Sequence, residues 1–327
     1  MTRRALHLVL LLAALASLGA NATRAAAQAS GQSRAALLLT LPSSARALAL
    51  GDAWGAVADD ENALFYNPAQ LARVRAWSVG GSLQRYIAST TLGAFAVAVP
   101  FARGTAAIGA QVLDYGSEPE LVSAEGAQSG DPTGASVSAQ DFALTAGYGA
   151  TFGAEHRLRI GGAVKYAQQH VANYSGSAVA GDVGAAYSLP SGWEFAGALQ
   201  HFGSELTLAA VTAPLPWTWR AAAAPPVANF GLFALRTMAE IRKSSGAVTT
   251  GVLAAEGTWH PARGATVLAA RAGYSFRGTG DDRSPLTLGG GVTLGRFSVD
   301  YAYEGFDLLG GATHRFGVRY TAAKRGS

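Results

Sequence analysis

Two stretches near the C-terminus alternate strictly between two kinds of side chain. In Arg296 to Gly305, every second residue is aromatic or valine: Phe297, Val299, Tyr301 and Tyr303. In Thr313 to Thr321, one side carries Phe316, Val318 and Tyr320, and the other carries Arg315, Gly317 and Arg319. This period of two is that of a β-strand. One apolar face and one charged face suit a wall between lipid and water, and they suit equally a soluble sandwich with its apolar face inward.

The N-terminus favours the membrane. Arg3 and Arg4 precede an apolar run from Ala5 to Ala20, and small residues follow as far as Ala29. This order is typical of a secretory signal peptide, and the run is too short for a membrane anchor. The sequence therefore predicts a signal peptide over residues 1–29 and a mature protein that leaves the cytoplasm.

Composition limits how the mature chain can cross a membrane. Charged residues make up 14% of the chain, below the roughly 25% that is usual for soluble domains. The 41 glycines disfavour helices, because each costs about 1 kcal/mol relative to alanine in a helix. No apolar run of 18 residues follows the signal, so crossing requires a closed barrel. The chain has no cysteine, which excludes disulfides and thiolate metal sites.

From Trp77 onward, fourteen amphipathic segments are separated by turn residues: 77–88, 91–100, 104–114, 138–150, 157–170, 178–188, 193–202, 216–223, 228–241, 248–259, 265–277, 286–294, 296–305 and 313–321. An even number is typical of single-chain bacterial barrels. The predicted fold is all-β, a transmembrane antiparallel β-barrel of about 14 strands. The connection from Tyr115 to Val137 is rich in Gly, Ser, Glu and Pro and is predicted to be an extracellular loop, and Gly278 to Pro285 is predicted to be another.

The chain divides into four parts: a signal peptide (1–29), an N-terminal segment (30–76), the barrel (77–321) and a short polar tail (322–327). In the N-terminal segment, Ala58 to Leu64 is predicted to form a short helix with acids in its first turn. Pro68 is predicted to fix a bend, because it forces Asn67 out of the helical region. The segment is patterned and apolar, so we expect it to pack against or inside the barrel.

The titratable residues point to a lumen rather than to an active centre. The histidines at 156, 170, 201, 260 and 314 are scattered and are interpreted as rim residues, so no metal site is predicted. No serine has nucleophile spacing, so no catalytic residue, cofactor site or enzyme activity is expected. Four charged residues on the inward face are predicted to pair across the last two strands: Asp300, Glu304, Arg315 and Arg319.

Charge also excludes one class of partner. Without Arg3, Arg4 and Arg24, 22 of the 25 basic residues remain against 21 acidic ones, so the formal net charge falls from +4 to +1. A nucleic-acid surface requires a clustered basic face, which this balance does not provide.

The N-terminal segment resembles the signature of the PorV/PorQ family of outer-membrane barrels. The resemblance rests on Gly51 and Gly55 in the run Arg46 to Asp60, and on the triplet Asn67, Pro68 and Ala69. The Asn-Pro-Ala triplet is similar, more distantly, to that of FadL-type transporters. The closing stretch Thr313 to Val318 resembles the family's last strand. Gln70 departs from the glycine that usually follows the triplet.

The PorV/PorQ resemblance implies an accessory or cargo-handling role in type IX protein secretion. Its partners would be outer-membrane lipid and secretion-system subunits or secreted cargo. The FadL likeness implies the alternative, a channel that passes a hydrophobic small molecule. Both imply the outer membrane of a Gram-negative cell and a structural role for the motif residues in the plug or turn.

Overall fold

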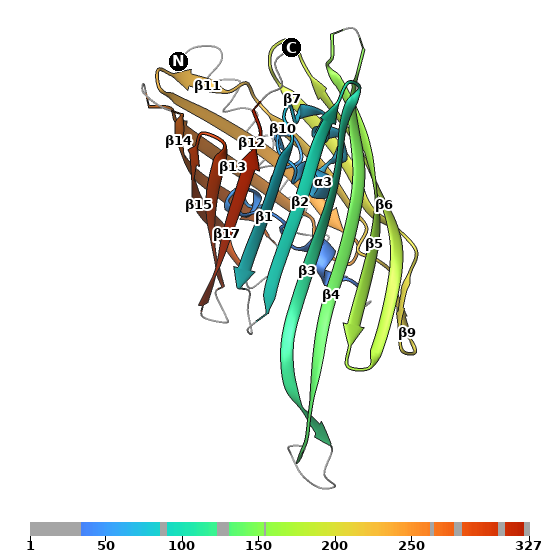
Figure 1. Ribbon diagram of the computed structural model, residues 1–327. Coiled ribbons are helices and arrows are strands. Elements are labelled where there is room, and N and C mark those ends of the chain that lie inside the picture. Colours follow the sequence, from blue (N-terminus) through green and yellow to red (C-terminus); the bar gives the residue numbers. More distant parts are fainter. Residues whose placement is uncertain are drawn as a thin grey trace.

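The computed structural model describes residues 34–85, 90–122, 131–153, 155–261, 265–277, 283–306 and 311–323. The predicted signal peptide and residues 324–327 of the predicted tail lie outside these ranges. The described chain forms a barrel with its N-terminal segment inside (Figure 1).

Fourteen antiparallel strands close the barrel. They are β1 Ser78–Arg85, β2 Thr91–Phe101, β3 Gly104–Val122, β4 Asp131–Phe152, β5 Leu158–Val171, β6 Tyr174–Ser188, β7 Glu194–Gly203, β10 Thr218–Ala224, β12 Phe233–Ser244, β13 Thr250–Trp259, β14 Thr266–Phe276, β15 Arg283–Leu294, β16 Phe297–Phe306 and β17 Gly311–Thr321. Each pairs with its neighbours, and closure comes from β1 with β17 and from β10 with β12. The predicted fourteen-stranded antiparallel barrel is confirmed.

Three short strands complete the set. β11 (Ala228–Phe230) pairs with β12 alone, after Pro225 and Pro226 interrupt the strand that begins as β10. Proline cannot donate to a ladder, which explains the break. β8 (Leu206–Leu208) and β9 (Val211–Ala213) form a separate hairpin that contacts β6.

The predicted loop from Tyr115 to Val137 is wrong over much of its length. β3 continues to Val122 and β4 begins at Asp131, so the two strands project as a ribbon beyond the rest of the barrel (Figure 1). The backbone ladder continues through bulges, with Glu118 opposite Val137. Ladder hydrogen bonds join main chains, so they do not require an apolar face in the sequence.

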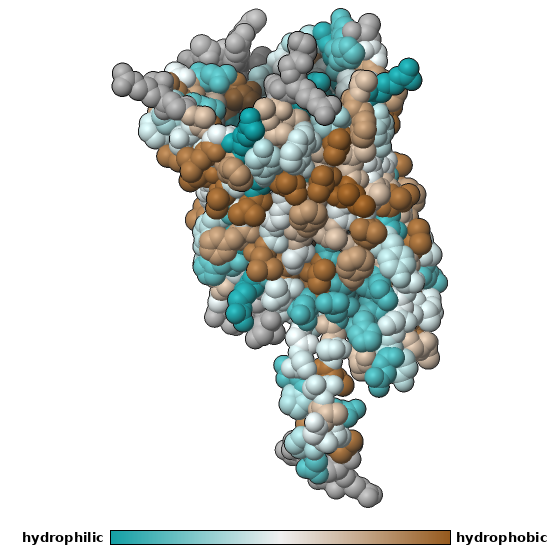
Figure 2. Space-filling model, in the orientation of Figure 1, coloured by the Kyte–Doolittle hydropathy of each residue, from teal (hydrophilic) through white to brown (hydrophobic). Residues whose placement is uncertain are grey.

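The two faces of the wall have the polarity that the alternation predicts. Figure 2 shows hydrophobic residues gathered in a belt across the wall. Outward side chains in the belt are large and apolar, such as Phe95, Ile108, Val164, Val299 and Phe316. Many inward side chains are buried and polar or charged, such as Gln84, Lys165, Glu240, Glu256 and Arg271. An apolar exterior around a polar interior is the arrangement of a transmembrane barrel.

The plug, residues 34–75, fills the lumen. It contains η2 (Leu37–Thr40), α2 (Ala45–Ala49), α3 (Ala63–Tyr66) and η3 (Pro68–Arg73). It begins near the β12–β13 turn, where Arg34 donates to the carbonyl of Ser245, and it ends at the opposite end of the barrel, beside β1. Within the described residues, no helix is long and apolar enough to cross a membrane.

The helix predicted over Ala58 to Leu64 starts later than expected. Residues 59–62 form a turn in which the backbone N–H of Asn62 donates to the carboxylate of Asp60, and helix begins only at Ala63. An aspartate that bonds the backbone two residues ahead favours a turn over a helix. The bend at Pro68 is confirmed, since Asn67 has an extended backbone with φ −155°.

Inward glycines of the wall let the plug approach closely. A Cβ on Gly149 or Gly161 would overlap the backbone of Pro68, and one on Gly273 would overlap the backbone at Gly51. Glycine permits such backbone contact because it has no side chain. These glycines therefore fix where the plug can lie against the wall.

Two adjacent glycines of β5 test this seat. Gly161→Val should destabilise the protein, because the new side chain would meet Pro68 and Ala69, and overpacking costs about 1–3 kcal/mol. Gly162→Val is the control, because Gly162 lies on the other face, where a Cβ meets only the carbonyl of Asp182, at 3.5 Å. The free energy of unfolding in detergent measures the difference, and equal losses for both variants would contradict the seat.

Candidate functional site

The seam between plug and wall brings together the residues of the N-terminal motif. Gly51 has φ +64° and lies under β13, where a Cβ would come 2.8 Å from Cγ1 of Val252. Gly55 donates its backbone N–H to Oε2 of Glu240 at 2.9 Å. Both glycines therefore lie where a side chain would collide with the wall, which is the structural role that the motif predicts.

Asn67, Pro68 and Ala69 start η3. The side chain of Asn67 accepts the N–H of Ala69 at 3.1 Å, which caps the helix, and Pro68 occupies its first turn. Proline suits this position because its missing N–H would have no helical partner. Gln70, the departure from the family pattern, is buried and donates to the carbonyls of Gly55 and Ala56. The triplet and Gln70 thus fix the turn of the plug.

Asp52 of the plug lies against two wall arginines. Arg220 contacts its carboxylate at 3.2 Å and Arg242 at 3.6 Å. Arg220 also pairs with Glu240 at 2.8 Å. The backbone carbonyl of Asp52 accepts from both arginines, and that of Gly51 accepts from Arg242. The wall therefore satisfies charges and carbonyls that the plug alone leaves unpaired.

A second chain of charges alternates in sign from plug to wall. Arg46 lies between Asp59 and Glu256 of β13, at 2.8 Å from each. Arg271 then joins Glu256 to Asp300, at 2.7 Å from each. The guanidinium of Arg46 also lies 4.6 Å from the centre of the Trp54 ring, within the range of a cation–π contact. Plug and wall thus share one network.

The charges around Asp59 keep it ionised. Burial by itself would raise the pKa of its carboxyl, but Arg46 and Arg236 outweigh burial and hold the pKa well below its usual range. Arg236 of β12 lies 3.2 Å from the second carboxylate oxygen. Opposite charges at this distance stabilise the ionised form.

The four residues predicted as a lumen network all lie on the inward face of β16 and β17, but their predicted pairing with one another is wrong. The register places Arg319 opposite Ser298 and Arg315 opposite Ala302. The observed partners lie elsewhere: Arg271 for Asp300, Arg277 for Glu304, Asp60 of the plug for Arg319, and the Pro42 carbonyl, Ser82 and Gln84 for Arg315.

One histidine predicted at the rim is instead inside. His201 is buried, and its ring lies 3.0 Å from the ammonium of Lys165, which pairs with Asp182 at 2.7 Å. A bulge between β6 and β7 places both Gln200 and His201 inward, and His201 has φ +59°. A bulge reverses the alternation, so the periodic pattern gave no signal for this cluster.

An apolar chamber occupies the lumen at the ribbon end. Its wall consists of inward leucines and alanines from β2 to β6: Leu92, Leu113, Ala143, Ala167, Ala178 and Ala180. The plug fills it with Ala35, Ala36, Leu38, Leu39 and Leu41. Leu206 of β8 and Leu215 also pack there. A water-filled pore has a polar interior, so this end of the lumen is built differently.

A second apolar surface lies outside the lumen. Outward side chains of β12 to β15 line a groove of about 330 Å³ that includes Ala239, Ala255, Tyr274 and Leu286. Because these residues face lipid, the groove belongs to the outer wall. Among the described residues, no group of three or more His, Asp or Glu is placed to hold a metal ion.

The comparisons with known proteins agree with this architecture. No protein-family model and no curated protein matches the chain. A Pseudomonas aeruginosa FadL homologue is similar at 12% identity and TM-score 0.56, over 87% of this chain and 99% of that one. The likeness is one of fold. The P. putida toluene transporter TodX matches at 11% and 0.54 over 86% and 98%, and the Ralstonia pickettii toluene transporter TbuX at 12% and 0.53 over 85% and 97%.

The FadL-type fold supports the more distant of the two predicted resemblances. These barrels are described as a FadL homologue and as toluene transporters. No finding bears on PorV/PorQ or on type IX secretion, so those interpretations stay predictions.

Removing one carboxylate tests the seam. Glu256→Gln leaves Arg46 and Arg271 without their shared acid, and breaking a buried pair costs about 3–5 kcal/mol. Glu118→Gln on the exposed ribbon is the control, with an expected change within about 0.5 kcal/mol. Urea unfolding in detergent micelles compares the two, and a change in Glu256→Gln as small as the control's would show that the seam contributes little.

Proposed function

We propose that the protein is an outer-membrane channel for small hydrophobic molecules, closed by its plug in the described state. The observation that carries this proposal is the apolar chamber. Its leucines and alanines offer no hydrogen bond to a polar solute, whereas burying apolar surface favours a hydrophobic one by roughly 25 cal/mol per Å². Leu38, Leu39 and Leu41 occupy the space that such a molecule would take.

The rest of the lumen explains why the plug must shift for passage. Beyond the chamber, the seam is charged and tightly packed against inward glycines such as Gly149 and Gly161. A hydrophobic molecule would not cross this region while the plug is seated, since it would displace ion pairs without replacing them. The channel therefore opens when the plug moves away from the wall.

The comparisons support the same class of cargo. TodX and TbuX are named as toluene transporters, and a TodX variant as a monoaromatic hydrocarbon channel. The neighbours also support the outer membrane and a non-enzymatic role. By the rule that longer loops face outward, the ribbon would face the exterior and the chamber would receive molecules from there.

Secretion is the competing function. It would require a surface that binds subunits or cargo, and no described feature favours such a surface over the chamber. The predicted signal peptide agrees with either function.

Leu113→Gln tests the chamber. The amide would lie among leucines and alanines, where an unsatisfied polar group costs about 1–3 kcal/mol, so entry of a hydrophobic molecule should fall several-fold. Uptake of a hydrophobic fluorescent dye by Gram-negative cells that carry the protein in their outer membrane measures the effect.

The matched control is Leu121→Gln, the same change on the same strand at an exposed ribbon position. It should leave dye uptake unchanged. Immunoblots of outer-membrane fractions correct for protein amount. Wild-type uptake no higher than in cells without the protein would reject the function.

A further inference from the structure

Glu61 is a fully buried carboxyl where the plug meets β1 and β17. Its exposed fraction is 0%. Oε1 accepts from the side-chain amide of Asn62 at 3.1 Å, whereas Oε2 has no hydrogen-bond partner among the described residues. Gly80 of β1 lies so close that a Cβ there would overlap Oε1. The carboxyl therefore has little room to turn.

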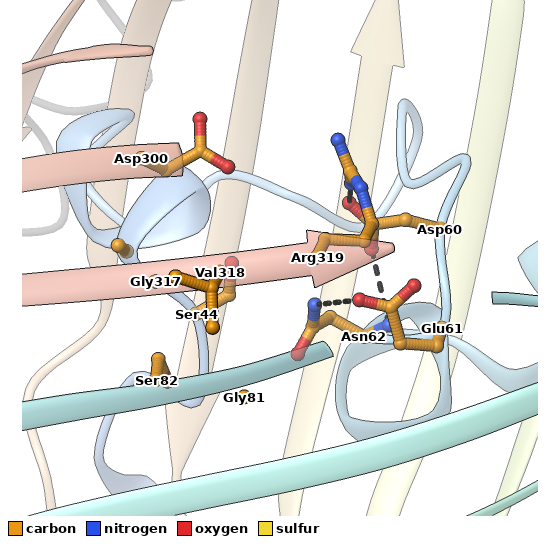
Figure 3. Close-up of a pocket in the computed structure, with 11 residues that line it drawn as sticks. Ser44, Asp60, Glu61, Asn62, Gly81, Ser82, Asp300, Gly317, Val318 and Arg319 are labelled. Atoms are coloured by element: carbon orange, nitrogen blue, oxygen red, sulfur yellow. Dashed lines mark hydrogen bonds and ion pairs between the residues drawn. The ribbon is translucent and has the colours of Figure 1, made fainter. Parts of the chain in front are cut away.

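A small polar cavity adjoins this carboxyl. Figure 3 shows Glu61 beside Asp60 and Asn62, near the end of the strand that carries Arg319. The cavity has a volume of about 20 Å³, room for about one water molecule. It cannot supply the several waters that a carboxylate binds in solution.

The charges facing Glu61 do not compensate a carboxylate. From the plug, Asp60 adds a negative charge at the next position. From β17, Arg319 faces the site but bonds to Asp60. From β16, Asp300 lines the cavity and bonds to Arg271. From β1, the groups are uncharged: the Gly80 backbone and the hydroxyl of Ser78.

We propose that Glu61 is a proton-binding site that controls how firmly the plug is seated. A proton on Oε2 would give that oxygen an O–H to donate to the hydroxyl of Ser78, which lies beside it and is also buried without a partner. One proton thus satisfies two groups and removes a negative charge next to Asp60. The ligand of this site is the proton itself, whichever molecule the channel passes.

The direction of the pH dependence follows from the seated and free plug. Burial, and then the charge of Asp60, raise the pKa of Glu61 from 4.5 to about 7 in the seated plug. A plug free in water would have the ordinary value. The seated plug therefore binds the proton more tightly, so its advantage is complete below 4.5 and is lost as the pH rises to about 7. Alkaline conditions favour release.

Infrared spectroscopy tests the proton directly. Wild-type protein in lipid vesicles should show the C=O stretch of a protonated carboxyl, with a titration midpoint near pH 7. Glu61→Gln keeps the shape and the Asn62 hydrogen bond and should lose this band. Glu118→Gln on the ribbon should retain it. A wild-type band absent at about pH 6, or one that persists in Glu61→Gln, would overturn the proposal.

The unfolding temperature supplies a second readout. It should fall for wild type between about pH 5 and about pH 8 and stay flat in this range for Glu61→Gln. Asp59 does not contribute there, because its pKa lies well below its usual range and it stays ionised. The same slope in both proteins would reject control by Glu61. Neither experiment uses a transported molecule, so the proposed function can fail independently.

Discussion

Buried charge is the constraint on which the rest of the structure depends. The barrel wall places arginines and acids in its lumen, away from bulk water, where each unpaired charge is costly. The plug supplies the missing partners: Asp52 for Arg220 and Arg242, Asp60 for Arg319, and Arg46 for Glu256. The plug therefore occupies one position, and moving it would break several ion pairs together.

Two other features reinforce that position. Inward glycines remove the side chains that would otherwise keep the plug backbone away from the wall. At the ribbon end, leucines of the plug fill an apolar chamber that would otherwise meet water. Charge, contact and apolar burial thus act at different depths of the lumen. The chamber suits a hydrophobic guest, while the charged seam holds the gate.

The sequence predicted what repeats locally and missed what depends on contacts between distant residues. The alternation that puts Val299 outward and Asp300 inward is visible in any short window, so the strands and their faces were predictable. The partners of Asp300 and Arg319 depend on register and on the plug, which no strand pattern contains. The inward His201 depends on a bulge, and the long ribbon on a ladder that continues through residues typical of loops. The glycines and Asn67 of the motif were identified because their chemistry is specific to tight contacts and turns.

A disulfide between plug and wall would test most directly whether the plug is the gate. The chain has no cysteine, and a Cβ on Gly317 would lie 3.3 Å from that of Ala45, close to the 3.5–4.5 Å typical of disulfides. The measurement is dye uptake by cells carrying the double variant Ala45→Cys and Gly317→Cys, under oxidising and then reducing conditions, with Ala45→Cys alone as control. We expect uptake to be lost when the bridge forms and restored by dithiothreitol. Equal uptake in the oxidised and reduced protein would show that molecules pass without movement of the plug.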